Sequence, residues 1–408
     1  MVAARMTRRL ALVIFMAAVL CASAASPLAD SPPPAQVLSN YENYWAAGLA
    51  RDCGYSQPLP SDPGISLWLF CDTAVHGANS QLQWRWLAQI NGSTGAEGPS
   101  TPGEVPSDLS ELATPGSGMP AMPNHDGPAQ FLPAPSGLVT SGGLPCDPAN
   151  GGYPASWISG VTQDAANPSD VLISYDNYCV PIVPSSNELT GEGFGLAAYD
   201  PASNTLDSQV TIFASSGGRP LGPQLLLGSP VFSGAHLFLF ASYCPQHNHV
   251  GLACTAGSGG NAVYLARVGA TPASWQDAGD FRWYASSSSW TTSASSAASV
   301  IPAAAPLAVN VQNFSALGHG LVLIEQTDGA GGFTVYQASG PAGAWSKLTS
   351  GKVPCAIEGD SLCRAIFGHP ELSTSSRLLV SYYDPAARPQ YNPAAGAEGH
   401  VMVAAFPW

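Results

Sequence analysis

Short apolar segments separated by turn residues dominate the pattern of the chain. Apolar positions with helical spacing are nearly absent, whereas β-branched and aromatic residues recur in short runs bounded by Gly, Ser, Asn and Pro. The clearest predicted strands are 66–73, 170–179, 236–244, 320–328 and 377–385. The pattern therefore predicts an all-β protein.

Each of these five segments has strand neighbours along the chain. A second predicted strand follows each one, at 82–90, 193–201, 261–268, 332–339 and 400–406, and the segments YPASWISG, LLLGSPVF, AVNVQNFS and FGHPELS precede the last four. Small sheets that cannot bury both faces alone can stack radially, which is the β-propeller architecture. We predict a five-bladed β-propeller over 41–408, closed by the N-terminal segment 37–45; a β-sandwich is the alternative.

A long segment between the first two clusters shows no strand pattern. Residues 92–145 are rich in Pro, Gly and Ser, and they carry one polar and aromatic stretch, PNHDGPAQFLP at 123–133. Long loops in compact folds are commonly functional or disordered. We expect this loop to pass over one face of the ring.

The N-terminus has the features of an export signal. Arg5, Arg8 and Arg9 precede an apolar run at 10–20, and small residues follow it. We therefore predict a signal peptide at 1–25, a Pro-rich spacer at 26–40 and a secreted or cell-wall-associated protein. The run is too short for a stable membrane span, so no membrane insertion is expected after processing.

The cysteines support an extracellular location. Eight follow the predicted signal peptide, and an even number in an exported chain indicates disulfides. Short separations suggest the pairs Cys53–Cys71, Cys146–Cys179, Cys244–Cys254 and Cys355–Cys363. The segment CPQHNHVGLAC at 244–254 also holds two histidines, but its spacing does not match structural zinc sites, so no metal site is predicted.

Charge and motifs exclude several function classes. The formal net charge is −14, so nucleic acid and anionic lipid, which bind basic surfaces, are not expected partners. A neutral or cationic ligand fits better. The sequence contains no GxSxG, P-loop, GxGxxG or HExxH motif.

Two aspartates are the first candidates for catalysis. Asp52 and Asp72 lie in neighbouring predicted strands of the first blade, where a Cys53–Cys71 disulfide would hold them at one rim. Paired carboxylates suit glycosidic hydrolysis: a separation of about 5 Å implies retention, and roughly 6.5–9.5 Å implies inversion. Aspartates also cap turns at strand ends, which is the structural alternative.

Further polar residues are candidates for ligand contacts. His369 and Glu371 alternate on one predicted strand and should therefore share a face. Both are candidates for sugar contacts, and Glu371 is also the candidate for a third acid. Glu192 is the second choice for that acid. A buried histidine bonded to a neighbouring blade is the alternative. Arg51, beside Asp52, and His125 and Asp126 in the long loop are assigned to substrate binding.

Two motifs resemble a known family. The family is that of secreted actinobacterial proteins known as domain-of-unknown-function family 4185. The start of these proteins resembles RDCGYSQPLP followed by SLWLFCDT, and their end resembles HPELS followed by LLVSYY. The resemblance implies a five-bladed propeller similar to arabinanases, and its relatives include endo-D-arabinanases of glycoside hydrolase family 183. It places Asp52 and Asp72 among first-blade acids, and His369 and Glu371 in a last-blade motif. Cys71 replaces the family's usual glycine.

These observations lead to two functional hypotheses. The first is a secreted, monomeric glycoside hydrolase acting on a furanose-rich polysaccharide such as arabinan, with acids from Asp52, Asp72 and Glu371. The second is a non-catalytic propeller that binds cell-wall glycan or a protein partner. No organic cofactor is expected. A structural calcium ion on the axis is compatible with either hypothesis, because related propellers carry one and the chain is acidic.

Overall fold

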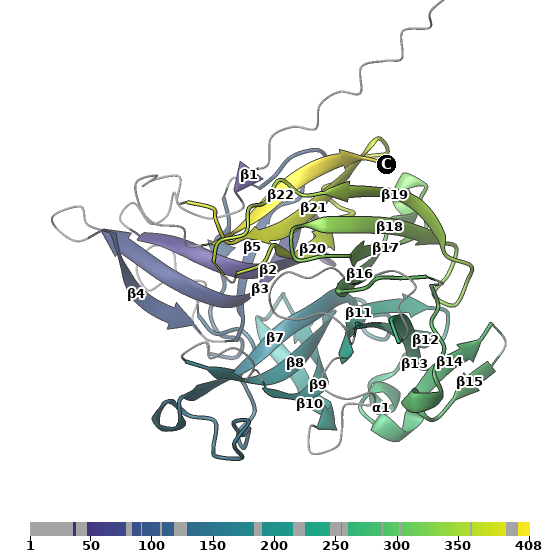
Figure 1. The fold of residues 1–408 in the computed structure, drawn as a ribbon, viewed down its shortest axis with the longest axis horizontal. Coiled ribbons are helices and arrows are strands. Elements are labelled where there is room, and N and C mark those ends of the chain that lie inside the picture. The colour runs from purple at the N-terminus through teal and green to yellow at the C-terminus, as the bar shows by residue number, and fades with distance from the viewer. Residues whose placement is uncertain are drawn as a thin grey trace, which may run out of the picture. The chain divides into compact units, whose positions relative to one another are not determined.

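Five small antiparallel sheets stand around one axis and form the five-bladed β-propeller predicted from the sequence (Figure 1). The computed structural model describes residues 36–37, 47–78, 84–90, 92–106, 108–117, 129–182, 190–214, 225–244, 254, 260–287, 289–301, 303–359, 361–388 and 399–408. These strands belong to the compact unit Pro33–Trp408. The predicted signal peptide lies outside the described residues.

The first strand of each blade is the innermost one. These inner strands are β2 (Ala47–Leu59), β7 (Gly152–Gln163), β11 (Leu225–Ser233), β16 (Ala308–Asn313) and β20 (Arg364–Gly368). Each contacts the inner strand of the next blade, and β20 contacts β2, so the ring is closed. The carboxyl ends of all five inner strands meet at one end of the axis, which shows that the inner strands run in the same direction.

Blade one differs from its predicted form. Its path is β2, β3 (Asp62–Ala78), β5 (Thr94–Pro99) and β6 (Ser110–Glu111), while β4 (Trp84–Ile90) pairs with the far part of β3. The expectation that 92–145 has no strands was therefore wrong for β5 and β6. The sequence of β5, TGAEGP, lacks the β-branched and aromatic pattern of a strand, because Gly95 and Gly98 lie against Phe131 and Leu109, where a Cβ would not fit.

Blades two and three follow the predicted strands closely. Blade two adds β8 (Val171–Pro181), β9 (Thr190–Asp200) and β10 (Thr205–Ala214) to β7. Blade three adds β12 (His236–Tyr243), β13 (Ala262–Gly269), β14 (Arg282–Ser286) and β15 (Ser289–Thr291) to β11. Helical turns are short: α1 (Pro272–Trp275) and the 3-10 turns Pro148–Asn150, Ala278–Asp280, Ala294–Ser296 and Ser315–Leu317.

Blade five combines both ends of the described chain. Blade four consists of β16, β17 (Leu321–Gln326), β18 (Gly332–Ala338) and β19 (Ser346–Lys352). Blade five consists of β20, β21 (Arg377–Asp384), β22 (His400–Pro407) and the N-terminal β1 (Gln36–Val37). Of the predicted closing segment 37–45, Val37 is described and pairs with Met402, and Gln36 before it pairs with Val403. The rest of the predicted closing segment lies outside the described residues.

The core lies between neighbouring blades. One cluster joins Trp68 and Phe70 of blade one to Leu379 and Val401 of blade five, and comparable clusters fill the other junctions. A second strand such as β8 is buried on both faces, so its sequence is an almost continuous apolar run. This two-sided burial explains why the second strands were the easiest to recognise.

The four predicted disulfides are confirmed. Cys53–Cys71, Cys146–Cys179, Cys244–Cys254 and Cys355–Cys363 have Cα atoms 5.4, 5.7, 6.1 and 6.0 Å apart. Four disulfides fit an extracellular protein. Within the described ranges, no helix has the length and apolar character needed to cross a membrane.

Candidate active site

An irregularity between β2 and β3 projects two carboxylates from blade one. Arg51 pairs with Thr73 and Cys53 with Phe70, so Asp52 alone faces two residues of β3, Cys71 and Asp72. Such bulges re-aim side chains. The strand β3 extends beyond the predicted strand 66–73 and continues to Ala78, so Asp72 does not lie at its end. The carboxylate is presented by the bulge.

The sequence Asp-Cys-Gly is what this bulge requires. Cys53 and Gly54 have φ values of 69° and 118°, and the disulfide Cys53–Cys71 ties the two strands at the same point. A Cβ on Gly54 would lie 2.7 Å from Cγ1 of Val401 in blade five. A glycine is therefore needed both for the backbone conformation and for the close approach of the last blade.

Asp72 is held by three donors. The Gly92 amide donates to Oδ1 at 2.6 Å, Trp157 Nε1 donates to Oδ1 at 3.0 Å, and the Tyr153 hydroxyl donates to Oδ2 at 2.7 Å. Burial raises the pKa of Asp72, the three hydrogen bonds reduce that rise, and the nearby charge of Asp52 adds to it. Asp72 therefore keeps a proton more readily than an ordinary aspartate.

Asp52 has a different environment. Arg364 donates from Nε and Nη2 to Asp52 Oδ2 at 3.0 and 2.7 Å, and the Cys53 amide donates to Oδ1 at 2.7 Å. The side chains of Asp52 and Arg364 are 23% and 42% exposed, so water reaches this ion pair. Arg364 is the first residue of β20, and Tyr153 and Trp157 lie in the first half of β7. The carboxylate pair, Asp52 and Asp72, therefore lies toward the amino ends of these inner strands.

Aromatic rings and a third acid surround the carboxylate pair. The rings of Trp157 and Tyr178 have centroids 4.7 Å apart, and the Arg364 guanidinium lies 4.1 Å above the Tyr383 ring. Asp176, a buried residue of β8, pairs in register with Trp157. Burial foremost, and then the charges of Asp176 and Asp52, raise the pKa of Tyr55. Asp176 thus lies opposite Trp157, the residue that donates to Asp72, and its charge acts on the same tyrosine as that of Asp52.

Only partial signals for these partners are visible in the sequence. Asp176 lies in the second strand of its blade, as Asp72 does in β3, and this repeated position was its signal. Trp157 was visible only as one of ten tryptophans. Arg364 carried no signal, because 312 positions separate it from Asp52.

Glu192, the second choice for the third acid, accepts a hydrogen bond from the Val139 amide at 3.3 Å and is buried in β9.

The structure places Arg51 inside blade one. Its side chain is 1% exposed, it pairs with the buried carboxylate of Glu111, and its guanidinium lies 4.3 Å from the centre of the Phe70 ring. Adjacent residues of a strand face opposite sides, which separates Arg51 from Asp52. In this arrangement Arg51 stabilises the blade and does not reach the carboxylate pair.

His369 and Glu371 lie at the other end of the inner strands. The prediction that they are alternate residues of one strand was wrong, because β20 ends at Gly368 and Pro370 follows. His369 is fully buried, with Nδ1 2.5 Å from Ser56 Oγ, and its ring lies 4.9 Å from that of Trp68. Glu371 is therefore not brought together with Asp52 and Asp72. The predicted contacts His125 and Asp126 lie outside the described residues.

The site can carry out proton transfer with its own side chains. One carboxyl group is partly buried with a raised pKa, and a second, partly exposed, is paired with arginine. Two titratable groups in such different environments are the usual equipment of acid–base catalysis. Across the described part of the chain, no group of three or more His, Cys, Asp or Glu residues could hold a metal ion.

A solved structure of another protein shares this fold, and others show a weaker similarity. A proposed hydrolase from Bacteroides ovatus matches with a TM-score of 0.53 and 15% identity, covering 91% of this chain and 93% of that one. A GH43_1 enzyme from Xanthomonas citri matches with a TM-score of 0.43 and 8% identity, over 91% and 90%. CoXyl43, a GH43 β-xylosidase/α-arabinofuranosidase from a compost metagenome, gives 0.43 and 8%, over 91% and 94%. No family model and no curated protein matches the sequence.

Proposed function

We propose that the protein is a secreted glycoside hydrolase that cuts a neutral, furanose-rich polysaccharide such as arabinan. The observation that carries the proposal is the carboxylate pair. Asp72 is held by three donors and has a raised pKa, whereas Asp52 is partly exposed and paired with Arg364. Glycosidic hydrolysis needs one carboxyl group that carries a proton and one that does not.

The two environments suggest the role of each residue. Protonated Asp72 would donate its proton to the glycosidic oxygen as the bond to the anomeric carbon breaks. Asp52 would accept a proton from the attacking water, or attack the anomeric carbon itself, depending on the separation of the two carboxyl groups. Tyr153 and Trp157 would hold Asp72 in place, and Arg364 would orient Asp52.

The surroundings also favour a neutral sugar. Trp157 and Tyr383 lie near the carboxylate pair and are not fully buried, and aromatic side chains commonly pack against sugar rings. The net charge of −14 opposes polyanionic glycans. The preference for furanose residues rests on the resemblance of the motifs RDCGYS and HPELS to a family whose relatives include arabinanases. Export, a monomeric state and cell-wall association belong to the same proposal.

Incubation of the purified protein with arabinan, arabinogalactan and lipoarabinomannan, followed by chromatography of released oligosaccharides, tests the proposal. We expect release by the wild type and a loss of about 10²-fold or more in Asp52→Asn and in Asp72→Asn. Asp207→Asn, at an exposed position of β10, is the matched control. An active double variant would remove the carboxylate pair from the mechanism.

One observation favours a non-catalytic glycan-binding propeller as the second candidate. All four oxygens of Asp52 and Asp72 already accept hydrogen bonds, from blades one, two and five, so the pair also ties these blades together. Glycan binding without released oligosaccharide, in the experiment above, would support this second function.

A further inference from the structure

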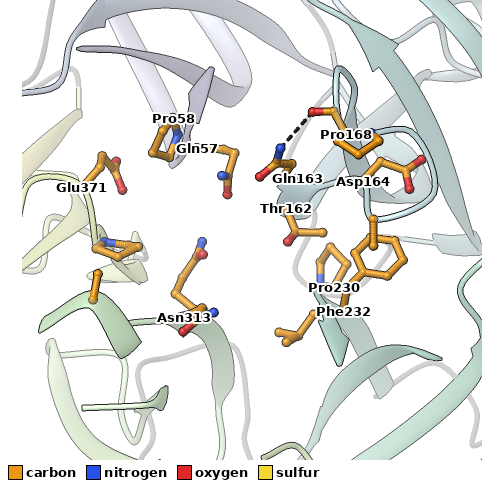
Figure 2. A pocket seen from close by; sticks show the side chains of 15 residues that line it. Gln57, Pro58, Thr162, Gln163, Asp164, Pro168, Pro230, Phe232, Asn313 and Glu371 are labelled. Atoms are coloured by element: carbon orange, nitrogen blue, oxygen red, sulfur yellow. Dashed lines mark hydrogen bonds between the residues drawn. The ribbon is translucent and has the colours of Figure 1, made fainter. Parts of the chain in front are cut away.

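A cavity of about 570 Å³ opens at the carboxyl ends of the inner strands, away from the carboxylate pair. Every blade contributes one segment to it, from the ends of β2, β7, β11 and β16 and from the turn after β20 (Figure 2). We call it the axial cavity. Its volume lies within the range of roughly 300–1,000 Å³ that is usual for small-molecule sites.

The lining has a definite chemical character. It includes the amides Gln57, Gln163, Gln312 and Asn313, together with the carboxylates Asp164 and Glu371. Phe232 and several prolines supply apolar surface, and no Lys, Arg or His is among the described residues that line the cavity. Amides donate and accept hydrogen bonds equally well, as hydroxyl groups do, and the missing positive charge disfavours anions.

Glu371 has an unused acceptor in this cavity. Its side chain is only 3% exposed, and Oε1 accepts a hydrogen bond from the Ser56 hydroxyl. Its Oε2 is buried and has no hydrogen-bond partner in the described protein. A buried carboxylate oxygen without a donor is costly. Figure 2 shows the carboxylate directed toward the space that Gln57 and Asn313 also face.

Neighbouring groups fix the orientation of these acceptors. His369 Nδ1 lies 2.5 Å from Ser56 Oγ, and Ser56 has a single proton to donate. If that proton goes to Glu371, His369 must donate to Ser56, which completes a chain from His369 through Ser56 to Glu371. On the opposite wall, Gln163 donates from Nε2 to the Pro168 carbonyl at 2.8 Å, so its oxygen is left facing the cavity (Figure 2).

We propose that the axial cavity is a binding site for a neutral polyhydroxylated ligand of the size of one or two sugar units, separate from the carboxylate pair. Glu371 Oε2 accepts a hydrogen bond from one ligand hydroxyl, and the amides of Gln57 and Gln163 bind others. Phe232 and the prolines pack against the ligand's C–H face. A cationic amine is the rival occupant, since a carboxylate also attracts positive charge.

Titration calorimetry on the full-length mature protein tests this site. The probes are L-arabinose, D-xylose and D-galactose, which have no glycosidic bond to cut, and spermidine as the cationic probe. We expect millimolar binding of at least one sugar, weakened about tenfold in Glu371→Gln, because one hydrogen bond to a charged group is lost. Gln163→Ala, at an exposed position that does not endanger folding, should also weaken it.

Two control variants separate the axial cavity from the carboxylate pair. Glu358→Gln, at an exposed glutamate outside the cavity, should leave the sugar affinity unchanged. Asp72→Asn alters sugar binding at the carboxylate pair, and in this variant the binding event that Glu371→Gln weakens should remain. Absence of binding to all three sugars, binding of spermidine alone, or binding lost in Asp72→Asn but kept in Glu371→Gln would each overturn the proposal. Because the readout is binding, it stands whether or not hydrolysis is observed.

Discussion

Arg364 donates two hydrogen bonds to a single carboxylate oxygen of Asp52, from Nε at 3.0 Å and from Nη2 at 2.7 Å. The first residue of the inner strand of blade five is thereby joined to the inner strand of blade one, 312 positions away. Both side chains remain partly exposed, at 42% and 23%. Ion pairs of this kind add little to stability, so the contribution of this one lies in orienting the carboxylate.

Replacing Arg364 with glutamine should therefore separate activity from stability. We expect kcat/KM on arabinan to fall by about 10–100-fold, since two charge-assisted hydrogen bonds that orient Asp52 are lost. The free energy of unfolding, from urea titration, should change by less than about 1 kcal/mol. Lys352→Gln, an exposed charge on β19, is the control for the altered net charge. Equal losses of activity in both variants would argue against the orienting role.

Removal of the Tyr153 hydroxyl should move the pH profile. This hydroxyl donates to Asp72 Oδ2 and opposes the rise in the pKa of Asp72 that burial causes. In Tyr153→Phe the pKa of Asp72 should rise further, because a hydrogen bond that favours the charged carboxylate is lost. Since Asp72 acts in its protonated form, the alkaline limb of the kcat/KM profile should shift to higher pH. Tyr284→Phe should leave it in place; a shift to lower pH would reverse the assigned role.

Gly54→Ala should damage the junction between blades one and five. The position combines a φ of 118° with a Cβ position 2.7 Å from Val401 Cγ1. Gly137→Ala is a matched control, because its φ is 89° and no atom lies within 4 Å of its Cβ position. Urea unfolding should show a loss of about 1 kcal/mol for Gly137→Ala and about 1–3 kcal/mol more for Gly54→Ala. Similar losses in both would mean that the junction can adjust.

The wild-type protein should be more stable in mild acid than at alkaline pH. Burial raises the pKa of seven carboxyl groups: Asp72, Glu97, Glu111, Asp164, Asp170, Glu325 and Asp384. A folded-state pKa above the unfolded value stabilises at low pH, and this contribution disappears as the pH rises through the folded pKa. The lowered pKa of His236 acts the other way, but it is a single group.

Thermal unfolding at pH 5, 6.5 and 8 measures this dependence. We expect Tm to fall from pH 5 to pH 8, and to fall less steeply in Asp72→Asn, which lacks one of the seven groups. A Tm that increases over this range would show that the buried carboxyl groups do not control the pH dependence of stability.

Much of the fold could be predicted because its strongest signals are local. Two-sided burial makes second strands such as β8 continuous apolar runs, and the short spacing of Cys53 and Cys71 indicated their disulfide. The same reasoning failed for β5, whose glycines approach Phe131 and Leu109 too closely for the usual strand residues. The residues of β5 are set by the side chains that pack onto it, so its own sequence lacks the pattern by which strands are recognised.

The candidate site was predictable only in its first blade. Asp52 and Asp72 were visible as acids beside paired cysteines, whereas Arg364, Tyr153 and Trp157 approach them only when blades two and five are in place. Glu371 was expected to join them, but β20 is only five residues long, and Glu371 lies beyond its far end. The position of a residue along an inner strand decides at which end of the axis its side chain lies. The motif HPELS does not show where β20 ends, so the location of Glu371 could not be predicted from it.

One junction links both ends of the axis. Strand β2 carries Asp52 and Ser56, which contact Arg364 at the start of β20 and His369 directly after its end. Between these two contacts, Tyr55 stacks on Phe367 with the ring centroids 3.8 Å apart. Among the described residues, the hydrogen-bonded pairing of the N-terminal segment with blade five comprises Gln36 and Val37. Transient parting of the first and last blades would break both contacts in one event. Amide hydrogen exchange along β2 and β20 should therefore proceed at a common rate, as expected for a single cooperative unit.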